Sequence, residues 1–221
     1  MYVHPAFKAD RAAALSFAAA RGFGLVVACA DGAPIASPVP FRIDYTPDGT
    51  PRASFHVAKA NGLAGLAAQG GRWLLAVTGA DAYVSPVWYA SPDQVPTWLY
   101  EAVHLAGPVQ LMSTDRLTQH LDELSDRFEA TPTAEANWSP QQITPGRREM
   151  LMKAIVGIDM LIETVEGSFK LNQHKSDADH VAVAEALAAR NDVGAQAISA
   201  RMLALRPHLQ YASTQEYAPT K

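Results

Sequence analysis

The sequence lacks the features that mark a secreted, membrane-spanning or nucleic-acid-binding protein. Cys29 is the single cysteine, so no internal disulfide can form, which is typical of a reducing compartment. No apolar run reaches the length that a bilayer-spanning helix needs. The 22 Asp and Glu residues outnumber the 18 Lys and Arg residues, so no general excess of positive charge attracts nucleic acid. We expect a cytoplasmic protein with no membrane partner.

Motifs that would name a reaction are also missing. The chain has no nucleophile elbow, no Walker loop and no GxGxxG sequence. Cys29 lies in an apolar segment, without a charged neighbour in sequence that would activate its thiol. The seven histidines show no metal-ligand spacing combined with a matching carboxylate. The sequence therefore identifies no catalytic residue and predicts no metal site.

The chain does contain many apolar residues, in segments whose pattern predicts β-strands. Hydrophobic residues make up 48% of it and charged residues 18%, which supports a sizeable core. Asp31-Gly32 is a hairpin turn signal, and Pro38 and Pro40 suggest a strand with one unpaired edge or a bulge. Six segments have strand character: 23–30, 34–45, 52–58, 73–79, 99–112 and one long final strand, 154–167.

Helical segments flank these strands without alternating regularly with them. Gly22 ends a first helix, and Asn61 lies near the start of a short second one. Ser176 with Asp179 resembles a capping box at the start of a C-terminal helix. Further helices are predicted at 114–129, where Leu117, Leu121, Leu124 and Phe128 recur at helical spacing, and at 193–205. This pattern favours an antiparallel barrel or α+β fold over a parallel sheet.

The segment "SFHVAKANG" (54–62) is a candidate phosphate site because a strand ends there and a helix begins. Lys59 supplies a cation, and His56 and Asn61 supply donors. The alternative interpretation is that Asn61 only caps the helix and that the Lys59 side chain is solvated.

The segment 83–100 is unusually rich in aromatic residues and proline. Trp88, Tyr89 and Trp98 could stack on a planar ring while Ser85 and Thr97 donate hydrogen bonds. The alternative is that these rings fill a barrel end or a dimer interface, where Trp and Tyr are also enriched.

A polar segment at 167–179 lies between the last predicted strand and a helix. It holds Lys170, Asn172, Gln173, His174 and Lys175. These side chains could meet the anionic groups of a ligand, or the segment could be an ordinary surface loop.

Four separated segments resemble the PaiB-type proteins, the FMN-binding negative transcriptional regulators. They are "HVAKAN" (56–61), "AYVSPVWY" (82–89), "VPTWLYEAVHLAGPV" (95–109) and "EGSFKLNQHKSDAD" (166–179), in that family's order and spacing. The start, "MYVHPAFK", resembles the family's opening, so the resemblance covers nearly the whole chain. Leu99 departs from the pattern, because Asn is frequent there in the family.

The resemblance implies an α+β, mainly β fold: a split antiparallel β-barrel of about six strands with peripheral helices. It implies a cofactor domain at 1–170, a C-terminal helical extension at 171–221, and a homodimer with non-covalent FMN at its interface. The residues carried over as FMN contacts are His56, Ala58, Lys59 and Asn61 for the phosphate, Ser85, Trp88, Val95, Pro96, Thr97 and Trp98 for a second region, and Lys170 and Gln173 for a third.

The resemblance favours a flavin-binding protein with a negative regulatory role in transcription or metabolism. DNA as a partner rests on the family name, because the chain shows no helix-turn-helix with a basic recognition helix. The one local basic cluster, around Arg147 and Arg148, is consistent with surface charges. The alternatives are an FMN-dependent oxidoreductase acting on a small molecule, and a haem-binding or cofactor-free relative with the same barrel.

Overall fold

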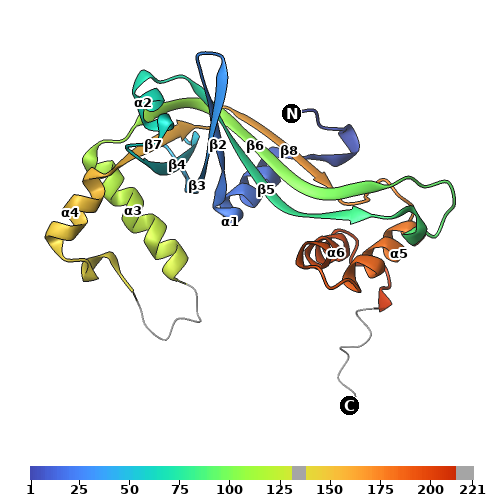
Figure 1. Ribbon diagram of the computed structural model, residues 1–221. Helices are drawn as coiled ribbons and strands as arrows, with labels where there is room; N and C mark the ends of the chain where they lie inside the picture. The colour runs from blue at the N-terminus through green and yellow to red at the C-terminus, as the bar shows by residue number, and fades with distance from the viewer. Residues whose placement is uncertain (131–137, 213–221) are drawn as a thin grey trace. The chain divides into compact units, whose positions relative to one another are not determined.

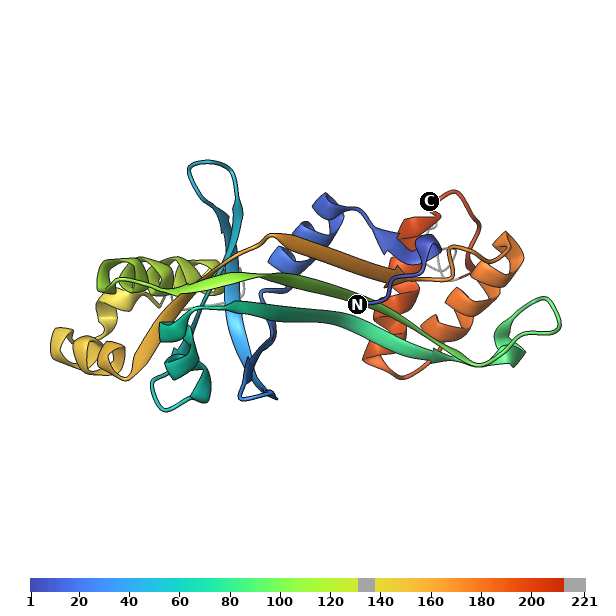
Figure 2. The same cartoon turned by 90° about the horizontal axis from the view of Figure 1, so that it is seen from above.

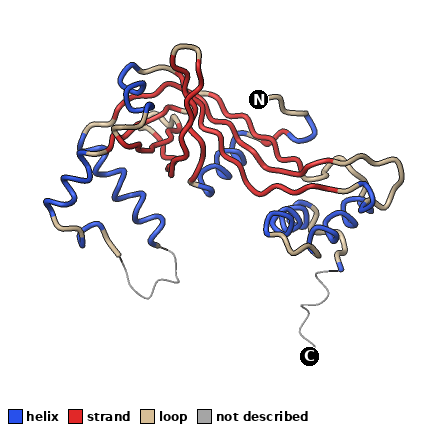
Figure 3. The backbone as a smooth tube through the Cα atoms, viewed as in Figure 1, coloured by secondary structure: helices blue, strands red, loops and turns tan. Residues whose placement is uncertain are grey.

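An eight-stranded antiparallel sheet organises the computed structural model, which describes residues 1–130 and 138–212 (Figure 3). The strand order is β1-β8-β6-β5-β2-β3-β4-β7, and an additional pairing joins β6 to β7. That pairing closes six strands into a ring, which confirms the predicted split barrel. The strands are β1 (Lys8–Ala9), β2 (Phe23–Ala30), β3 (Ala33–Tyr45), β4 (Pro51–Ala58), β5 (Arg72–Val84), β6 (Thr97–Leu111), β7 (Ile155–Leu161) and β8 (Thr164–Lys170).

The chain divides into two compact units, which we describe separately. Unit 1 comprises Met1–Ala13, Thr78–Val103 and the chain from Glu166 onward, and unit 2 comprises Ala14–Val77 and His104–Val165. The long strands β5 and β6 contribute residues to both units (Figure 1). The domain boundary expected after residue 170 stays a prediction.

The hairpin of β2 and β3 in unit 2 follows the predicted turn. Asp31 and Gly32 have φ values of 51° and 79°, as a two-residue turn with left-handed central residues requires. β3 pairs with β2 as far as Pro40 and with β4 only from Phe41 onward, so Pro38 lies where β3 has a single pairing. Neither Pro38 nor Pro40 pairs with β4, so the edge of β3 that faces away from β2 is open at both prolines. This confirms the open edge expected from the sequence.

The barrel of unit 2 closes where β6 meets β7. Val109 pairs with Met160 there, and both side chains are buried. At Gly107 the backbones come so close that an added Cβ would lie 1.7 Å from the carbonyl oxygen of Leu161. Only glycine fits this position. The large side chains buried completely in the barrel are Phe41, Phe55, Leu75, Leu105, Ile158 and Met160.

The single long strand predicted at 154–167 was wrong, because the structure breaks it into β7 and β8. The break lies at Ile162 and Glu163. The Ile162 amide donates to the Pro51 carbonyl at 2.8 Å, and the next amide donates to the Ala106 carbonyl at 3.0 Å. The Ile162 amide thus bonds to β4 and the Glu163 amide bonds to β6. The chain changes its hydrogen-bonded neighbour strand between these two residues.

The predicted helices are confirmed, with caps close to those expected. Gly22 follows α1 with a φ of 60°, and Ser113 caps α3 through a bond from the Arg116 amide. Ser176 caps α5 by accepting from the Asp179 amide. None of the helices in the described ranges is long and apolar enough to span a membrane. The helices are α1 (Arg11–Arg21), α2 (Gly62–Gln69), α3 (Thr114–Glu129), α4 (Pro145–Lys153), α5 (Asp177–Ala188) and α6 (Val193–Leu205).

Unit 1 has its own core, formed where α5 and α6 pack side by side (Figure 2). Leu99 of β6 and Val84 of β5 belong to it, and neither is exposed. Ile198 and Met202 of α6 complete the contact. The C-terminal helices are thus part of the hydrophobic core that the ends of β5 and β6 share.

Candidate cofactor site

Three residues predicted from the sequence as FMN contacts line one cavity in unit 1. Val95 and Thr97 belong to the aromatic segment, and Lys170 ends β8. The cavity has a volume of about 230 Å³ and is named here the lysine–aromatic pocket. Its lining is Phe7, Tyr89, Val95, Thr97, Lys170, His174 and Lys175.

The two lysines of this pocket are held by neutral partners. The Lys170 ammonium donates to Thr97 Oγ1 and lies 5.8 Å from the centre of the Phe7 ring. The Lys175 ammonium donates to the side chain of Gln94 at 2.6 Å and lies 5.1 Å from the centre of the Tyr89 ring. No carboxylate is among the described residues that line the pocket. Two oriented positive charges beside aromatic faces suit an anion with a planar body.

His174 responds to the same positive charge. Its ring lies edge-on to Phe7, with centroids 5.1 Å apart. Burial, and after it the charges of Lys175 and Lys170, lower the pKa of His174 below its usual value. An anion bound in the pocket would offset the two ammonium charges and would raise that pKa again.

The loop after β8 is fixed in a conformation that positions the lysines. Asn172 has a φ of 60°, in the left-handed region. The Gln173 side chain accepts from the Leu171 amide at 2.7 Å and donates to the Phe169 carbonyl. Arg206, which directly follows α6, donates to the carbonyls of Gln173 and Lys175 at 2.9 and 3.2 Å.

Gln173, carried over as a cofactor contact, therefore has both ends of its amide bound to backbone. It lines a different cavity of unit 1, beside Arg201, and not the lysine–aromatic pocket. The structure does not bring Gln173 and Lys170 to one cavity wall, although Phe7 lines both cavities. The role of Gln173 stays a prediction.

The predicted aromatic contacts gather around Tyr83. Its ring lies 6.4 Å from Trp88 and 6.1 Å from Trp98, edge-on to both. Trp88 packs on the unit 1 core, with Arg190 over its ring, and Trp98 is 54% exposed. Ser85 precedes the turn η2 (Pro86–Trp88) without capping it, and Pro96 is exposed. Trp88 and Trp98 thus surround Tyr83, and these three residues are named the Tyr83 cluster. Val95 and Thr97 line the lysine–aromatic pocket, whereas Ser85 and Pro96 belong to neither group.

The aromatic segment is anchored to α5 by a buried carboxylate. Asp179 accepts hydrogen bonds from the amide and the hydroxyl of Ser91 at 2.9–3.0 Å. Ser91 in turn accepts from Gln94, the partner of Lys175. This chain of bonds connects the helix start to the pocket wall and orders the loop between them.

The residues predicted to bind the FMN phosphate lie in unit 2, at the end of β4 and directly after it. Asn61 caps α2 by accepting from the Leu63 amide at 2.9 Å, and its amide nitrogen donates to Ser37 at 3.0 Å. The predicted cap at Asn61 is thus confirmed, and its role as a phosphate contact stays a prediction. Ala58 and Lys59 are exposed, and the Lys59 amide donates to the Ala154 carbonyl at 2.9 Å. Within the described ranges, the Lys59 ammonium has no hydrogen-bond or ion-pair partner.

His56, the fourth residue predicted to bind the phosphate, lies beside a second histidine. His56 Nδ1 lies 3.4 Å from Nε2 of His120, a fully buried residue of α3. Burial lowers the pKa of His56, and burial together with the nearby charges of His56, Arg116 and Arg42 lowers the pKa of His120 to about 3. Both rings are therefore neutral near pH 7. No group of three metal-binding side chains occurs in the described part of the chain.

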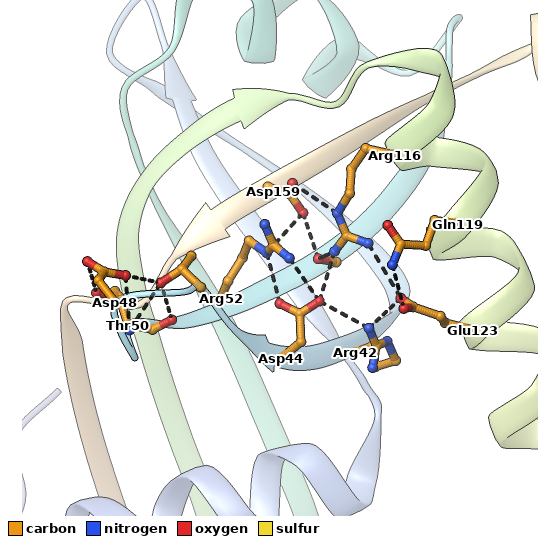
Figure 4. A network of polar contacts seen from close by, with 11 residues as sticks. Arg42, Asp44, Asp48, Thr50, Arg52, Arg116, Gln119, Glu123 and Asp159 are labelled. Atoms are coloured by element: carbon orange, nitrogen blue, oxygen red, sulfur yellow. Dashed lines mark hydrogen bonds and ion pairs between the residues drawn. The ribbon is translucent and has the colours of Figure 1, made fainter.

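A charged network continues from this pair beneath α3 (Figure 4). Asp44 accepts from Arg52 at 2.8 Å and from Arg116 at 2.8 Å. Asp159, which is 3% exposed, accepts from the hydroxyl of Ser54 at 2.6 Å. This network was not predicted from the sequence, although polar residues alternate along β3 and β4 in a way that signals a polar sheet face. Its other members are Arg42, Gln119 and Glu123.

Comparison with known proteins identifies the family. Residues 1–164 match the family described as "Putative FMN-binding domain". The chain belongs to this family. It is 29% identical over 188 residues to "Protease synthase and sporulation protein PAI 2" of Bacillus subtilis (strain 168), covering 85% of this chain and 89% of that protein. It is also 27% identical over 110 residues to the uncharacterized protein AN0679 of Emericella nidulans, covering 44% of each chain.

Solved structures confirm the split-barrel fold. The "FAD and Heme binding protein" of Mycobacterium smegmatis superposes with a TM-score of 0.55 at 20% identity, covering 73% of this chain and 71% of that one. The "Flavocytochrome Anf3" of Azotobacter vinelandii gives a TM-score of 0.56 at 17% identity, covering 73% and 67%. The predicted PaiB-type family and fold are confirmed, and the family match supports FMN as the predicted cofactor.

Proposed function

We propose that the chain binds FMN non-covalently and that the lysine–aromatic pocket holds the phosphate group. The convergence of Lys170 and Lys175 on one pocket without a lining carboxylate carries this proposal. Thr97 would orient Lys170, and the rings of Phe7 and Tyr89 would exclude water from one side of the anion. FMN, when bound, supplies redox chemistry that the side chains lack.

The Tyr83 cluster is the neighbouring aromatic surface in unit 1 and the proposed contact for the planar ring system of the cofactor. Its rings offer edges and faces at separations typical of aromatic packing. The strand-end residues His56, Ala58, Lys59 and Asn61 remain the alternative phosphate site. Substitution of Lys59 therefore separates the two assignments.

We propose that the functional unit is a homodimer with the cofactor at its interface. The segment from Tyr83 to Trp98 exposes large apolar side chains, with Val87 84% exposed, Val95 71% and Trp98 54%. Several exposed apolar side chains within one segment favour association. Sedimentation at micromolar concentration tests this, and a monomer that still binds FMN would contradict it.

A regulatory role is the proposed biological function, in line with the relative whose name refers to protease synthesis and sporulation. The chain carries a formal net charge of −4, which does not favour direct DNA binding. Binding to candidate promoter DNA and to random DNA at physiological salt tests repression through DNA. Equal, weak binding to both would contradict it.

The absorbance spectrum of the purified protein, followed by titration with FMN, tests the cofactor. We expect a flavin spectrum, release of FMN on denaturation, and rebinding by the stripped protein. Lys170→Met should weaken FMN binding about tenfold or more, because a charged hydrogen bond is lost while the aliphatic stem remains.

The matched control is Lys8→Met, which removes the same charge from an exposed position in β1, outside the pocket. It should leave FMN affinity unchanged. A colourless protein that takes up no FMN would contradict the proposal, and reduction of bound flavin by NADH or NADPH would instead favour the oxidoreductase.

A further inference from the structure

Unit 2 contains a larger cavity that the proposed function does not use. It lies where α3 begins, beside α4 and the start of β7, and has a volume of about 380 Å³. Figure 1 and Figure 2 both show α3 and α4 as neighbours of β7. We name this cavity the strand-end cleft, after Lys59, which follows β4 and lines its rim.

The wall of the strand-end cleft is aliphatic and adaptable. Leu111, Leu117, Met152 and Ile155 are among its lining residues. No aromatic side chain is among the described residues that line it, in contrast to the lysine–aromatic pocket. Methionine and leucine side chains accommodate a flexible chain better than they hold a rigid planar ring.

The charged groups of the cleft are predominantly positive. Lys59 and Lys153 come from different elements and are brought together by the bond from the Lys59 amide to the Ala154 carbonyl. Neither ammonium has an ion-pair or hydrogen-bond partner in the described ranges, and both lysines are exposed. Glu149 is the single lining carboxylate, so the lining side chains carry a net charge of +1.

The start of α3 adds to this positive character. Ser113 and Thr114 line the cleft, and the positive end of the dipole of this 16-residue helix points toward it. An inorganic anion would meet the lysines but leave the aliphatic wall in contact with water. A neutral apolar molecule would fill the wall but leave the lysines without a partner.

We infer that the strand-end cleft binds a small aliphatic anion, a medium-chain carboxylate, with its charged group at Lys59 and Lys153. The two lysines meet the carboxylate, and the leucine and methionine side chains cover the chain. The volume is within the range of small-molecule sites. The strand-end cleft shares no lining residue with the lysine–aromatic pocket, and a carboxylate ligand there goes beyond the proposed function.

Calorimetric titration with octanoate tests the inference on the purified full chain, with and without FMN. The neutral probe 1-octanol isolates the contribution of charge, and acetate isolates that of the aliphatic chain. We expect one octanoate per chain, with 1-octanol and acetate each binding at least about tenfold more weakly.

The double variant Lys59→Met/Lys153→Met should weaken octanoate binding by about tenfold or more while retaining both aliphatic stems. Arg147→Met is the matched control, because it removes a positive charge from the same helix at an exposed position outside the cleft. It should leave octanoate affinity unchanged. Lys153→Met alone should leave FMN affinity unchanged, because Lys153 belongs to neither candidate phosphate site.

Four results would overturn the inference. The first two are the absence of octanoate binding at millimolar concentration and binding of acetate as strong as that of octanoate. The other two are an equal loss of octanoate affinity in the double variant and in Arg147→Met, and displacement of FMN by octanoate. The last result would make the cleft part of the cofactor site. Failure of FMN binding would leave the octanoate result in the FMN-free protein intact, so the two proposals fail separately.

Discussion

The network beneath α3 in unit 2 pairs its charges with one another, whereas the lysine–aromatic pocket of unit 1 leaves two ammonium groups without a counterion among the described residues. Beneath α3, Arg52 and Arg116 meet Asp44, and Arg116 also lies 3.5 Å from Asp159 (Figure 4). In the lysine–aromatic pocket, Lys170 and Lys175 meet a hydroxyl, an amide and two aromatic rings. The ion pairs of the network stabilise the fold, because each charge already has an opposite charge beside it. Lys170 and Lys175 have no such counterion in the part of the chain that the structure describes, so they can bind an anionic ligand.

The same contrast applies to the histidines of the two units. His120 is buried, with the positive charges of Arg116 and Arg42 nearby, so its neutral state is a consequence of packing. His174 lies on the wall of an open pocket, where the positive charges that lower its pKa are the charges that an anion would meet. Four substitutions separate a structural from a ligand-binding role.

Asp159→Ala should have the largest effect on stability. It removes the buried acceptor of Ser54 and one of the carboxylates that Arg116 meets, and removing one partner of a buried ion pair costs about 3–5 kcal/mol. Urea unfolding measures the loss. The control is Glu163→Ala, which breaks the exposed ion pair with Arg72 in the same unit and should cost at most about 1 kcal/mol. Equal losses would show that the network is not structural.

Leu99→Asn introduces the residue that is frequent in the family at this position. Leu99 has no exposed surface and lies in the unit 1 core, so the substitution should cost about 2–4 kcal/mol of unfolding free energy. Val87→Asn, at an 84% exposed site, is the control and should change stability little. Unchanged stability with tighter FMN binding would instead place residue 99 against the cofactor.

His120→Gln should change how stability depends on pH. The folded pKa of about 3 is below the unfolded value of 6.5, so only the unfolded state takes up this proton between those values. Stability should therefore fall as the pH is lowered through this window, by about 1.4 kcal/mol per pH unit for the one proton. Urea unfolding from pH 7 to pH 4.5 should give a shallower slope in the variant than in wild type or in His208→Gln.

Asn61→Ala should have the smallest effect, about 1 kcal/mol, because it removes the cap of α2. Asn61→Ser keeps a capping oxygen and should recover most of that loss. FMN affinity should be the same in both variants. A large loss of FMN affinity at unchanged stability would restore Asn61 as a phosphate contact.

Local signals in the sequence predicted the local structure well. Asp31-Gly32, Ser176 and the leucine spacing at 114–129 each act within a few residues, and each gave the observed element. The split of the final strand was not predictable in this way. It depends on hydrogen bonds from Ile162 to Pro51 and from Glu163 to Ala106, which only the closed barrel brings together.

The candidate site was predictable only in part for the same reason. Lys170, Thr97 and Val95 were found because each lies in a segment that resembles the family. Phe7 lies 163 residues before Lys170, and nothing in its own surroundings marks it as a wall of that pocket. The network around Asp159 combines three strands and one helix, so the sequence showed its members only as scattered charges.

The affinity of FMN relative to riboflavin, measured in wild type and in Lys170→Met, tests the central claim most directly. Riboflavin lacks the phosphate, so their ratio isolates the contribution of the anion. We predict that wild type binds FMN more tightly by about tenfold or more, and that Lys170→Met brings the ratio close to one without weakening riboflavin. An unchanged ratio in Lys170→Met, or a ratio that falls in Lys59→Met instead, would contradict the assignment.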